Sequence, residues 1–208
     1  MSISLIPIAH RGFWNKKNNK NSMDAFIRAF ENGFGVETDL RYDNNQIIIS
    51  HDLPTSKSVP FSELLNLYAN QKKLPLALNI KNDGLQNFIL DLLNKYNITN
   101  YFVFDMSIPD LLGYRNLGLH YFVRQSEYEP VNTLFDDASG IWLDQFNSDW
   151  VDFNTLKMHV LNKKKLCIVS PELHGRQPDF AWANYKKILD KLPSNAKIYL
   201  CTDYPNRI

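Results

Sequence analysis

Glu37 and Asp39, in the stretch VETDLR, are the two residues of this sequence best placed to hold a metal ion. Residues i and i+2 of a β-strand point to the same face, so the two carboxylates are expected side by side. Adjacent carboxylates repel each other, and a divalent cation offsets that repulsion. Hard oxygen ligands suit Mg²⁺ or Ca²⁺. The alternative is an ion pair with Arg41 or Lys81.

Two histidines form a second candidate pair, because each follows an apolar segment. His10 lies in PIAHRG and His51 lies in ISHD. Histidine titrates near neutral pH, so these two can act as general base and general acid in one reaction. Arg11 and Lys81 add fixed positive charge, which suits a phosphate group. Together these residues predict a catalytic site that holds a metal ion and a phosphate group.

The remaining histidines are weaker candidates. His120 falls inside an apolar run and His159 on a predicted helix, so both are interpreted as structural. His174, in SPELHGR, follows a predicted strand and is left open between a structural and a functional role. The polar stretch NKKNNKN (15–21) is predicted to be a solvated loop.

Short β-branched or aromatic runs alternate with longer amphipathic runs along the chain. Eight strands with intervening helices imply parallel pairing and a closed (β/α)8 TIM barrel of the α/β class. A doubly wound open sheet is the alternative. A further strand, 46–50, is predicted to pair with 35–40 through a turn at 42–45. The eight barrel strands are 3–9, 35–40, 74–80, 100–105, 119–124, 139–144, 165–170 and 196–203, and the helices are 22–33, 61–69, 85–96, 108–116, 152–164 and 179–192.

In such barrels the chemistry lies at the carboxyl ends of the strands, which is where the candidate residues fall. One residue fits the strand pattern poorly. Pro7 has no N–H to donate to a ladder and is unexpected inside a central strand.

Length and composition indicate one globular domain over residues 1–208. Hydrophobic residues make up 44% and charged residues 22%, which argues against disorder, and the net charge of +1 argues against a general nucleic-acid binder. Cys167 and Cys201 fall in apolar runs and are predicted to be buried free thiols. The start of the chain lacks a signal-peptide pattern, and no stretch reaches the roughly 18 apolar residues of a membrane span. A cytoplasmic protein is predicted.

Five motifs in order, IAHRG, VETDLR, ISHD, LNIK and CTDYP, resemble the glycerophosphodiester phosphodiesterase family. The matches extend from Pro7 to Pro205. The resemblance implies a (β/α)8 barrel that hydrolyses a phosphodiester next to a free hydroxyl. It implies a divalent metal, Mg²⁺ or Ca²⁺, on Glu37 and Asp39, with His10 and His51 as general acid and base. The expected substrate is a small-molecule or glycan-linked phosphodiester, and the sequence does not fix the oligomeric state.

Two positions depart from the pattern of that family. Asn79 stands where the family has a glutamate two residues before the lysine, here Lys81, and its amide oxygen is an uncharged candidate ligand. Glu172 is a further candidate for the missing carboxylate. Lys20 stands where the family has an acidic residue. Two alternatives therefore stay open: a barrel that binds phosphorylated ligands without cleaving them, and a phospholipase D-like lyase that forms a cyclic phosphate.

Overall fold

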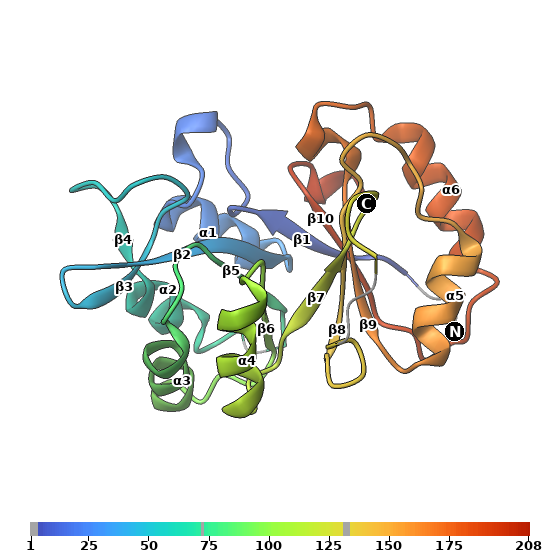
Figure 1. Ribbon diagram of the computed structural model, residues 1–208. Coiled ribbons are helices and arrows are strands. Elements are labelled where there is room, and N and C mark those ends of the chain that lie inside the picture. Colours follow the sequence, from blue (N-terminus) through green and yellow to red (C-terminus); the bar gives the residue numbers. More distant parts are fainter. Residues whose placement is uncertain (1–3, 72, 131–133) are drawn as a thin grey trace. The chain divides into compact units, whose positions relative to one another are not determined.

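The computed structural model describes residues 4–71, 73–130 and 134–208 and divides into two compact units. The N-terminal unit is residues 8–121, and the C-terminal unit combines residues up to Pro7 with 122–208. Figure 1 shows the order of the elements along the chain. All six predicted helices are present. They are α1 (Met23–Glu31), α2 (Phe61–Tyr68), α3 (Gln86–Lys95), α4 (Ile108–Asn116), α5 (Phe153–Leu161) and α6 (Asp179–Leu189).

The N-terminal unit is built on parallel strands, as predicted. Parallel pairing joins β1 to β2, β2 to β5, and β5 to β6. The predicted hairpin is also confirmed: β3 runs antiparallel to β2, with a turn at Asn44 and Asn45, whose φ angles are both positive. A two-residue strand that the sequence pattern did not reveal, β4, extends this hairpin. The strands are β1 (Ile6–His10), β2 (Gly35–Asp43), β3 (Gln46–Ile49), β4 (Val59–Pro60), β5 (Leu76–Ile80) and β6 (Tyr101–Phe104).

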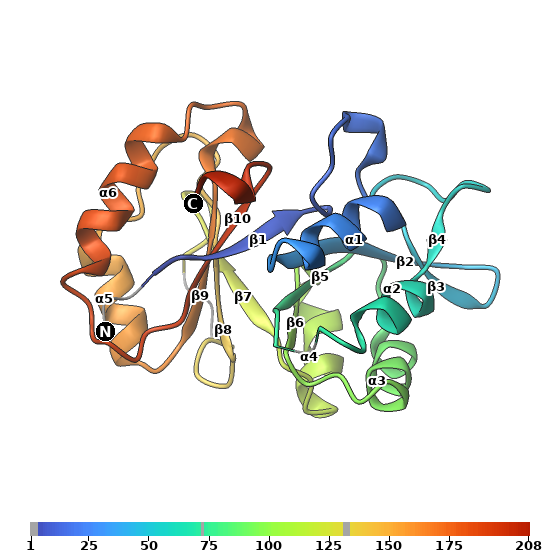
Figure 2. The same ribbon diagram turned by 180° about the vertical axis from the view of Figure 1, so that it is seen from behind.

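The C-terminal unit repeats the parallel pattern in a simpler form. Its four strands pair in parallel in the order β7, β8, β9, β10. Helices α5 and α6 lie on the same side of these strands, as Figure 2 shows. The strands are β7 (Phe122–Gln125), β8 (Gly140–Leu143), β9 (Lys165–Val169) and β10 (Ile198–Thr202), and short 3-10 helices are η1 (Lys17–Asn19), η2 (Pro171–His174) and η3 (Pro205–Arg207).

Helix α1 shows why the predicted elements form where they do. The Ser22 hydroxyl accepts a hydrogen bond from the N–H of Ala25 and caps the helix, as its position before the apolar stripe predicts. Phe26 and Phe30 on that stripe are buried. Gly33 follows the helix with a φ of +74°, a conformation that glycine adopts without strain.

Two further sequence predictions concern apolar segments. Cys167 and Cys201 are buried free thiols, as expected. Within residues 4–71, 73–130 and 134–208, no helix is both long and apolar enough to cross a membrane. The predicted first strand starts at Ile3, which lies outside the described residues; strand β1 itself begins at Ile6.

Candidate active site

Strand register brings the predicted side chains of the N-terminal unit together. His10 is the register partner of Glu37 across β1 and β2. Asp39 is the register partner of Asn79 across β2 and β5. The three candidate oxygen ligands therefore come from two adjacent strands, near the carboxyl end of β5.

Both carboxylates are buried: Glu37 is 2% exposed and Asp39 is 1% exposed. The backbone N–H of Arg11 donates to Glu37 Oε2 at 3.1 Å, and His10 Nε2 lies 3.9 Å from the same oxygen. Burying a carboxylate is costly unless positive charge or hydrogen bonds compensate. The surroundings of each carboxylate therefore decide its charge state.

Asp39 receives most of the compensating charge. Its Oδ2 lies 3.0 Å from Arg11 Nε and accepts a 2.9 Å hydrogen bond from the Asn21 amide. Its Oδ1 lies 3.3 Å from Lys81 Nζ. The ion pair with Lys81 that sequence reasoning weighed against a metal site is thus present. Arg41 takes no part in it, because its guanidinium donates to the backbone carbonyls of His51 and Lys81.

Glu37 is less well compensated than Asp39. Burial, together with the negative charge of Asp39, raises the pKa of Glu37 from 4.5 to about 8, although Arg11 and Lys81 oppose the rise. Without a further cation, the protein therefore disfavours the ionised form of Glu37. A divalent cation next to this carboxyl would favour its ionised form.

Asn79 and Asp39 offer the acceptor atoms that a cation would use. Asn79 donates from Nδ2 to Asp105 Oδ2 at 3.1 Å, which leaves its carbonyl oxygen directed elsewhere. Asn79 Oδ1 is buried without a hydrogen bond, and Asp39 Oδ1, which also lacks one, lies 3.3 Å from the Lys81 ammonium. Buried oxygens that lack a hydrogen bond are uncommon and suit a hard cation. Within the described residues, however, no three His, Cys, Asp or Glu side chains cluster as a metal site. The donor set that fits a cation is thus two carboxylates and one amide oxygen.

The HRG motif has a local geometry that explains its residues. Arg11 has a φ of +56°, and in this conformation its N–H faces Glu37 while its side chain reaches Asp39. Gly12 also has a positive φ, and a Cβ atom there would lie 2.8 Å from the Cβ of Ala25. The motif therefore requires glycine for close packing against α1.

His51 lies in a cleft of about 520 Å³ that Arg11 also lines. Its Nδ1 lies 2.9 Å from Asp52 Oδ1, and its side chain is 43% exposed. This contact occupies Nδ1 and leaves Nε2 as the second nitrogen that can exchange a proton. An exposed imidazole beside a basic cleft can exchange protons with a bound ligand.

Glu172 belongs to the C-terminal unit and has partners there. Its carboxylate accepts hydrogen bonds from the hydroxyls of Ser170 and Thr202 and, at 3.0 Å, from the N–H of Asp203. These contacts account for Glu172 without a metal, and its role as a ligand stays a prediction. His174, left open from sequence, pairs with Asp144 at 2.6 Å.

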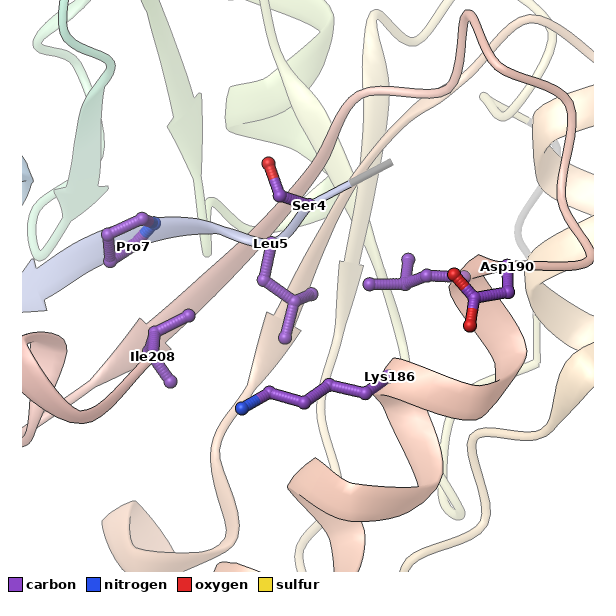
Figure 3. Close-up of a pocket in the computed structure, with 7 residues that line it drawn as sticks. Ser4, Leu5, Pro7, Lys186, Asp190 and Ile208 are labelled. Atoms are coloured by element: carbon purple, nitrogen blue, oxygen red, sulfur yellow. The ribbon is translucent and has the colours of Figure 1, made fainter. Parts of the chain in front are cut away.

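A second cavity lies in the C-terminal unit and holds none of the predicted side chains. Its volume is about 330 Å³, and Leu5, Pro7 and Ile208 supply apolar walls. Figure 3 shows Lys186 of α6 and Asp190, the residue that follows α6, beside it. The cleft at His51 is therefore the better candidate for a reaction site.

Two features of the site have little trace in the sequence pattern. Asn21 ends the stretch predicted as a solvated loop, yet it donates to Asp39 and accepts from the Thr38 hydroxyl. Asp105, which follows β6, orients the amide of Asn79. The position of Asp105 at the end of a predicted strand was the available signal for its role.

The comparisons with known proteins agree on the fold. No protein-family model and no curated protein sequence matches the chain. A phosphodiesterase from Oleispira antarctica, solved with the product sn-glycerol-3-phosphate, matches with a TM-score of 0.74 and 16% identity, over 97% of this chain and 94% of that one. Glycerophosphodiester phosphodiesterases from Parabacteroides distasonis (TM-score 0.71, 15% identity, 98% of this chain, 94% of that one) and Agrobacterium tumefaciens (0.66, 12%, 98%, 98%) match similarly. The predicted α/β barrel is thus confirmed, and the chain has the fold of solved glycerophosphodiester phosphodiesterases.

Proposed function

We propose that the protein is a metal-dependent phosphodiesterase acting on a glycerophosphodiester-like substrate. The observation that carries the proposal is the buried pair Glu37 and Asp39 next to Arg11 and Lys81, in a fold shared with solved phosphodiesterases. Buried carboxylates with incomplete compensation are expected at functional sites, where the ligand completes the charge balance.

The chain's own residues supply the acid–base chemistry. One histidine, His10 or His51, removes the proton from the attacking hydroxyl or water, and the other protonates the departing alkoxide. Arg11 and Lys81 stabilise negative charge on the phosphoryl oxygens. A Mg²⁺ or Ca²⁺ ion held by Glu37, Asp39 and Asn79 would act as a Lewis acid toward those oxygens.

The direct test is hydrolysis of glycerophosphocholine and of an aryl phosphodiester by the purified protein with Mg²⁺ or Ca²⁺. We expect turnover that EDTA abolishes. General acid–base catalysis contributes about 10²–10⁴-fold, so His10→Ala and His51→Ala should each lower kcat by a factor in this range. His120→Ala is the matched control, because His120 is exposed in the same unit and stacks on Tyr101. Wild-type rates in either active-site variant would disprove the two-histidine assignment.

A binding protein without hydrolytic activity is the second candidate. Burial disfavours the charged form of Glu37, and Asp39 lies between the two cations Arg11 and Lys81, so the protein alone favours an anion. Asn79 also contributes no charge toward a metal. This candidate predicts tight binding of glycerol 3-phosphate that EDTA leaves unchanged, and no turnover with any divalent metal.

A lyase that forms a cyclic phosphate is the third possibility kept from the sequence. It uses the same classes of residue, so the reaction product distinguishes it from a hydrolase. Phosphorus NMR of the products separates a cyclic phosphate from an open monoester. We expect the open monoester.

A further inference from the structure

Two aspartates outside the candidate active site meet where the segment after β5 contacts the start of α4. Asp83 lies in that segment, and Asp110 lies in the first turn of α4. The Ser107 hydroxyl joins them, because it donates to Asp83 Oδ2 at 3.1 Å and accepts from the Asp110 N–H at 3.4 Å. Within residues 4–71, 73–130 and 134–208, neither carboxylate forms an ion pair. Two acidic groups of the N-terminal unit therefore lie close together without a basic partner.

Asp110 is 7% exposed, and its two carboxylate oxygens have different surroundings. Oδ1 accepts from the Gly84 N–H at 2.8 Å and from the side-chain amide of Gln86, the first residue of α3. Helices α3 and α4 lie side by side at this contact (Figures 1 and 2). Oδ2 is buried without a hydrogen bond. The N-terminus of α4 favours a negative charge at Asp110, but Oδ2 still lacks a donor.

Tyr114 adds a third oxygen to this place. It lies about one helical turn after Asp110, so the two side chains share one face of α4. The side chain is fully buried, and its hydroxyl has no hydrogen-bond partner in the described part of the chain. Burial raises the pKa of Tyr114, and the negative charges of Asp110 and Asp83 raise it further, so the hydroxyl is near both carboxylates. Buried polar atoms without partners are uncommon, and this face of α4 has two of them.

We infer that Asp83, Asp110 and the Tyr114 hydroxyl bind a divalent cation of the Ca²⁺ class. Carboxylate and hydroxyl oxygens are hard ligands, and Ca²⁺ accepts irregular geometry and completes its coordination with water. The cation would give Asp110 Oδ2 the partner that it lacks and would offset the repulsion between the two carboxylates. The inference does not depend on the proposed function, because none of these residues belongs to the candidate active site.

The number of charged ligands sets the expected affinity. Within the described residues no cluster of three His, Cys, Asp or Glu side chains is present, so this site has only two carboxylates. Ca²⁺ sites with few charged ligands bind with Kd on the order of 10⁻⁴–10⁻³ M. A buried water is the other possible occupant, since it too would satisfy Asp110 Oδ2 and the Tyr114 hydroxyl. A water neutralises no charge, so Ca²⁺ titration distinguishes the two occupants.

Calcium titration of the full chain tests the inference. The Glu37→Gln/Asp39→Asn variant removes the carboxylates of the candidate active site, so Ca²⁺ that still binds must lie elsewhere. By calorimetry after chelator treatment, we expect one Ca²⁺ per chain with Kd on the order of 10⁻⁴–10⁻³ M. Adding Asp110→Asn keeps an acceptor oxygen, loses the charge and should weaken binding at least tenfold. Adding Asp91→Asn is the matched control, because Asp91 is an exposed carboxylate on α3 of the same unit, and should leave the affinity unchanged.

Terbium luminescence tests whether the cation lies beside the tyrosine. Tb³⁺ occupies Ca²⁺ sites, and a nearby aromatic ring sensitises its emission. In the Glu37→Gln/Asp39→Asn chain, excitation of tyrosine should produce Tb³⁺ emission that Ca²⁺ competes away. Tyr114→Phe should lower this emission, whereas Tyr96→Phe, at the end of α3, should leave it unchanged. Tyr114→Phe keeps the ring and Asp83→Asn changes an exposed side chain, so these two variants serve if Asp110→Asn fails to fold.

The outcomes separate the cation from a water and from the candidate active site. In the wild-type chain, Asp83→Asn should lower the number of bound Ca²⁺ ions by one. No Ca²⁺ binding to the Glu37→Gln/Asp39→Asn chain would overturn the inference and favour a buried water. Ca²⁺ affinity that is the same with and without Asp83→Asn and Tyr114→Phe would overturn it by placing the cation elsewhere. Neither result changes the expected phosphodiester hydrolysis, which is measured separately.

Discussion

Both units have buried polar side chains at the ends of their strands, but these side chains differ in how completely they are hydrogen-bonded. In the C-terminal unit, Gln145 is fully bonded: its amide donates to Val169 O and Tyr185 Oη, and its oxygen accepts from Val151 N–H. In the N-terminal unit, Asp39 Oδ1 and Asn79 Oδ1 are buried without hydrogen bonds. Polar residues at strand ends therefore do not by themselves indicate chemistry, and the two regions differ in whether these strand-end acceptors have hydrogen bonds.

The same contrast appears in the charged groups. Within the described residues of the C-terminal unit, no buried oxygen of Asp144 or Glu172 lacks a hydrogen bond, and each has partners in its own unit. Glu37 in the N-terminal unit has its pKa raised to about 8 by burial and by Asp39. A buried carboxylate at a binding site can retain an unfavourable burial free energy that the bound ligand offsets. A carboxylate in a structural network is already stabilised by its hydrogen-bond partners.

Of the variants that test this difference between the two units, Asp39→Asn is expected to have the largest effect on metal binding and activity. Removing this charge should weaken Mg²⁺ binding and lower kcat/KM on the order of 10³-fold, because Asp39 also positions Arg11 and Lys81. Asp144→Asn is the counterpart in the C-terminal unit. It should lower the free energy of unfolding by about 1–3 kcal/mol through loss of the His174 pair. Calorimetry with Mg²⁺ and urea unfolding of both variants measure the two effects.

If Asp144→Asn lost Mg²⁺ affinity and Asp39→Asn kept it, the metal site would lie at Asp144 and the structural ion pair at Asp39. Equal loss of activity in both variants would place Asp144 in the reaction site as well.

The next effect is the pH dependence of stability. Each unit buries a titratable side chain whose charged form is disfavoured, His159 in one and Glu37 in the other. Burial and the nearby Lys164 lower the pKa of His159 from 6.5 to about 4. The unfolded chain then binds more protons than the folded one between these values, so acid destabilises the fold. The free energy of unfolding should fall by about 2 kcal/mol from pH 7 to pH 5. His159→Gln should remove this loss, as urea unfolding at several pH values would show.

Glu37 gives the opposite sign in the metal-free protein. Its folded pKa of about 8 lies above the ordinary 4.5, so the folded chain holds the proton that the unfolded chain has lost. Stability due to Glu37 should therefore decrease as pH rises from about 4.5 to about 8. Glu37→Gln should flatten this part of the unfolding profile. A flat wild-type profile in EDTA over this range would contradict the burial of an uncompensated carboxyl.

A smaller effect tests the amide ligand. Asn79→Glu should tighten Mg²⁺ binding by about tenfold, because a carboxylate adds charge where the amide contributes only an oxygen dipole. Asn79→Ala is the control and should weaken binding. Calorimetry in the presence of Mg²⁺ distinguishes the variants. Unchanged or weaker binding in Asn79→Glu would show that position 79 does not ligate the metal.

Repeated local signals made the architecture predictable from sequence. Local signals mark the helices unevenly, and α1, with its apolar stripe, the Ser22 cap and the Gly33 stop, carries the clearest set. Parallel pairing follows from the alternation of strands and helices. Pro7, which fitted the strand pattern poorly, lies within β1. Pairing of β1 with β2 begins at Ile8, so Pro7 lies outside that ladder.

The site was predictable only in part. Spacing placed Glu37 and Asp39 on one face, and strand order placed Lys81 near them. The role of Asn21 depends on a tertiary contact between a polar loop and β2, which no local pattern encodes. Lys17 and Lys57, which are far apart in sequence, line the cleft at His51 for the same reason. Whether a polar group is compensated is a property of such contacts, so sequence alone could not separate Glu172 from Glu37.

Glu172→Gln is expected to have the smallest effect, and it tests whether Glu172 is a structural residue or a metal ligand. The Glu172 carboxylate accepts from two hydroxyls and the N–H of Asp203, and glutamine keeps an acceptor but loses the charge that strengthens these bonds. The free energy of unfolding should fall by about 1 kcal/mol, with Mg²⁺ affinity unchanged. Calorimetry and urea unfolding on the same protein sample give both quantities. Unchanged stability with weaker Mg²⁺ binding would instead identify Glu172 as a metal ligand that replaces the carboxylate missing at Asn79. The hydrogen bonds that Glu172 accepts from Ser170, Thr202 and Asp203 would then describe the metal-free protein alone.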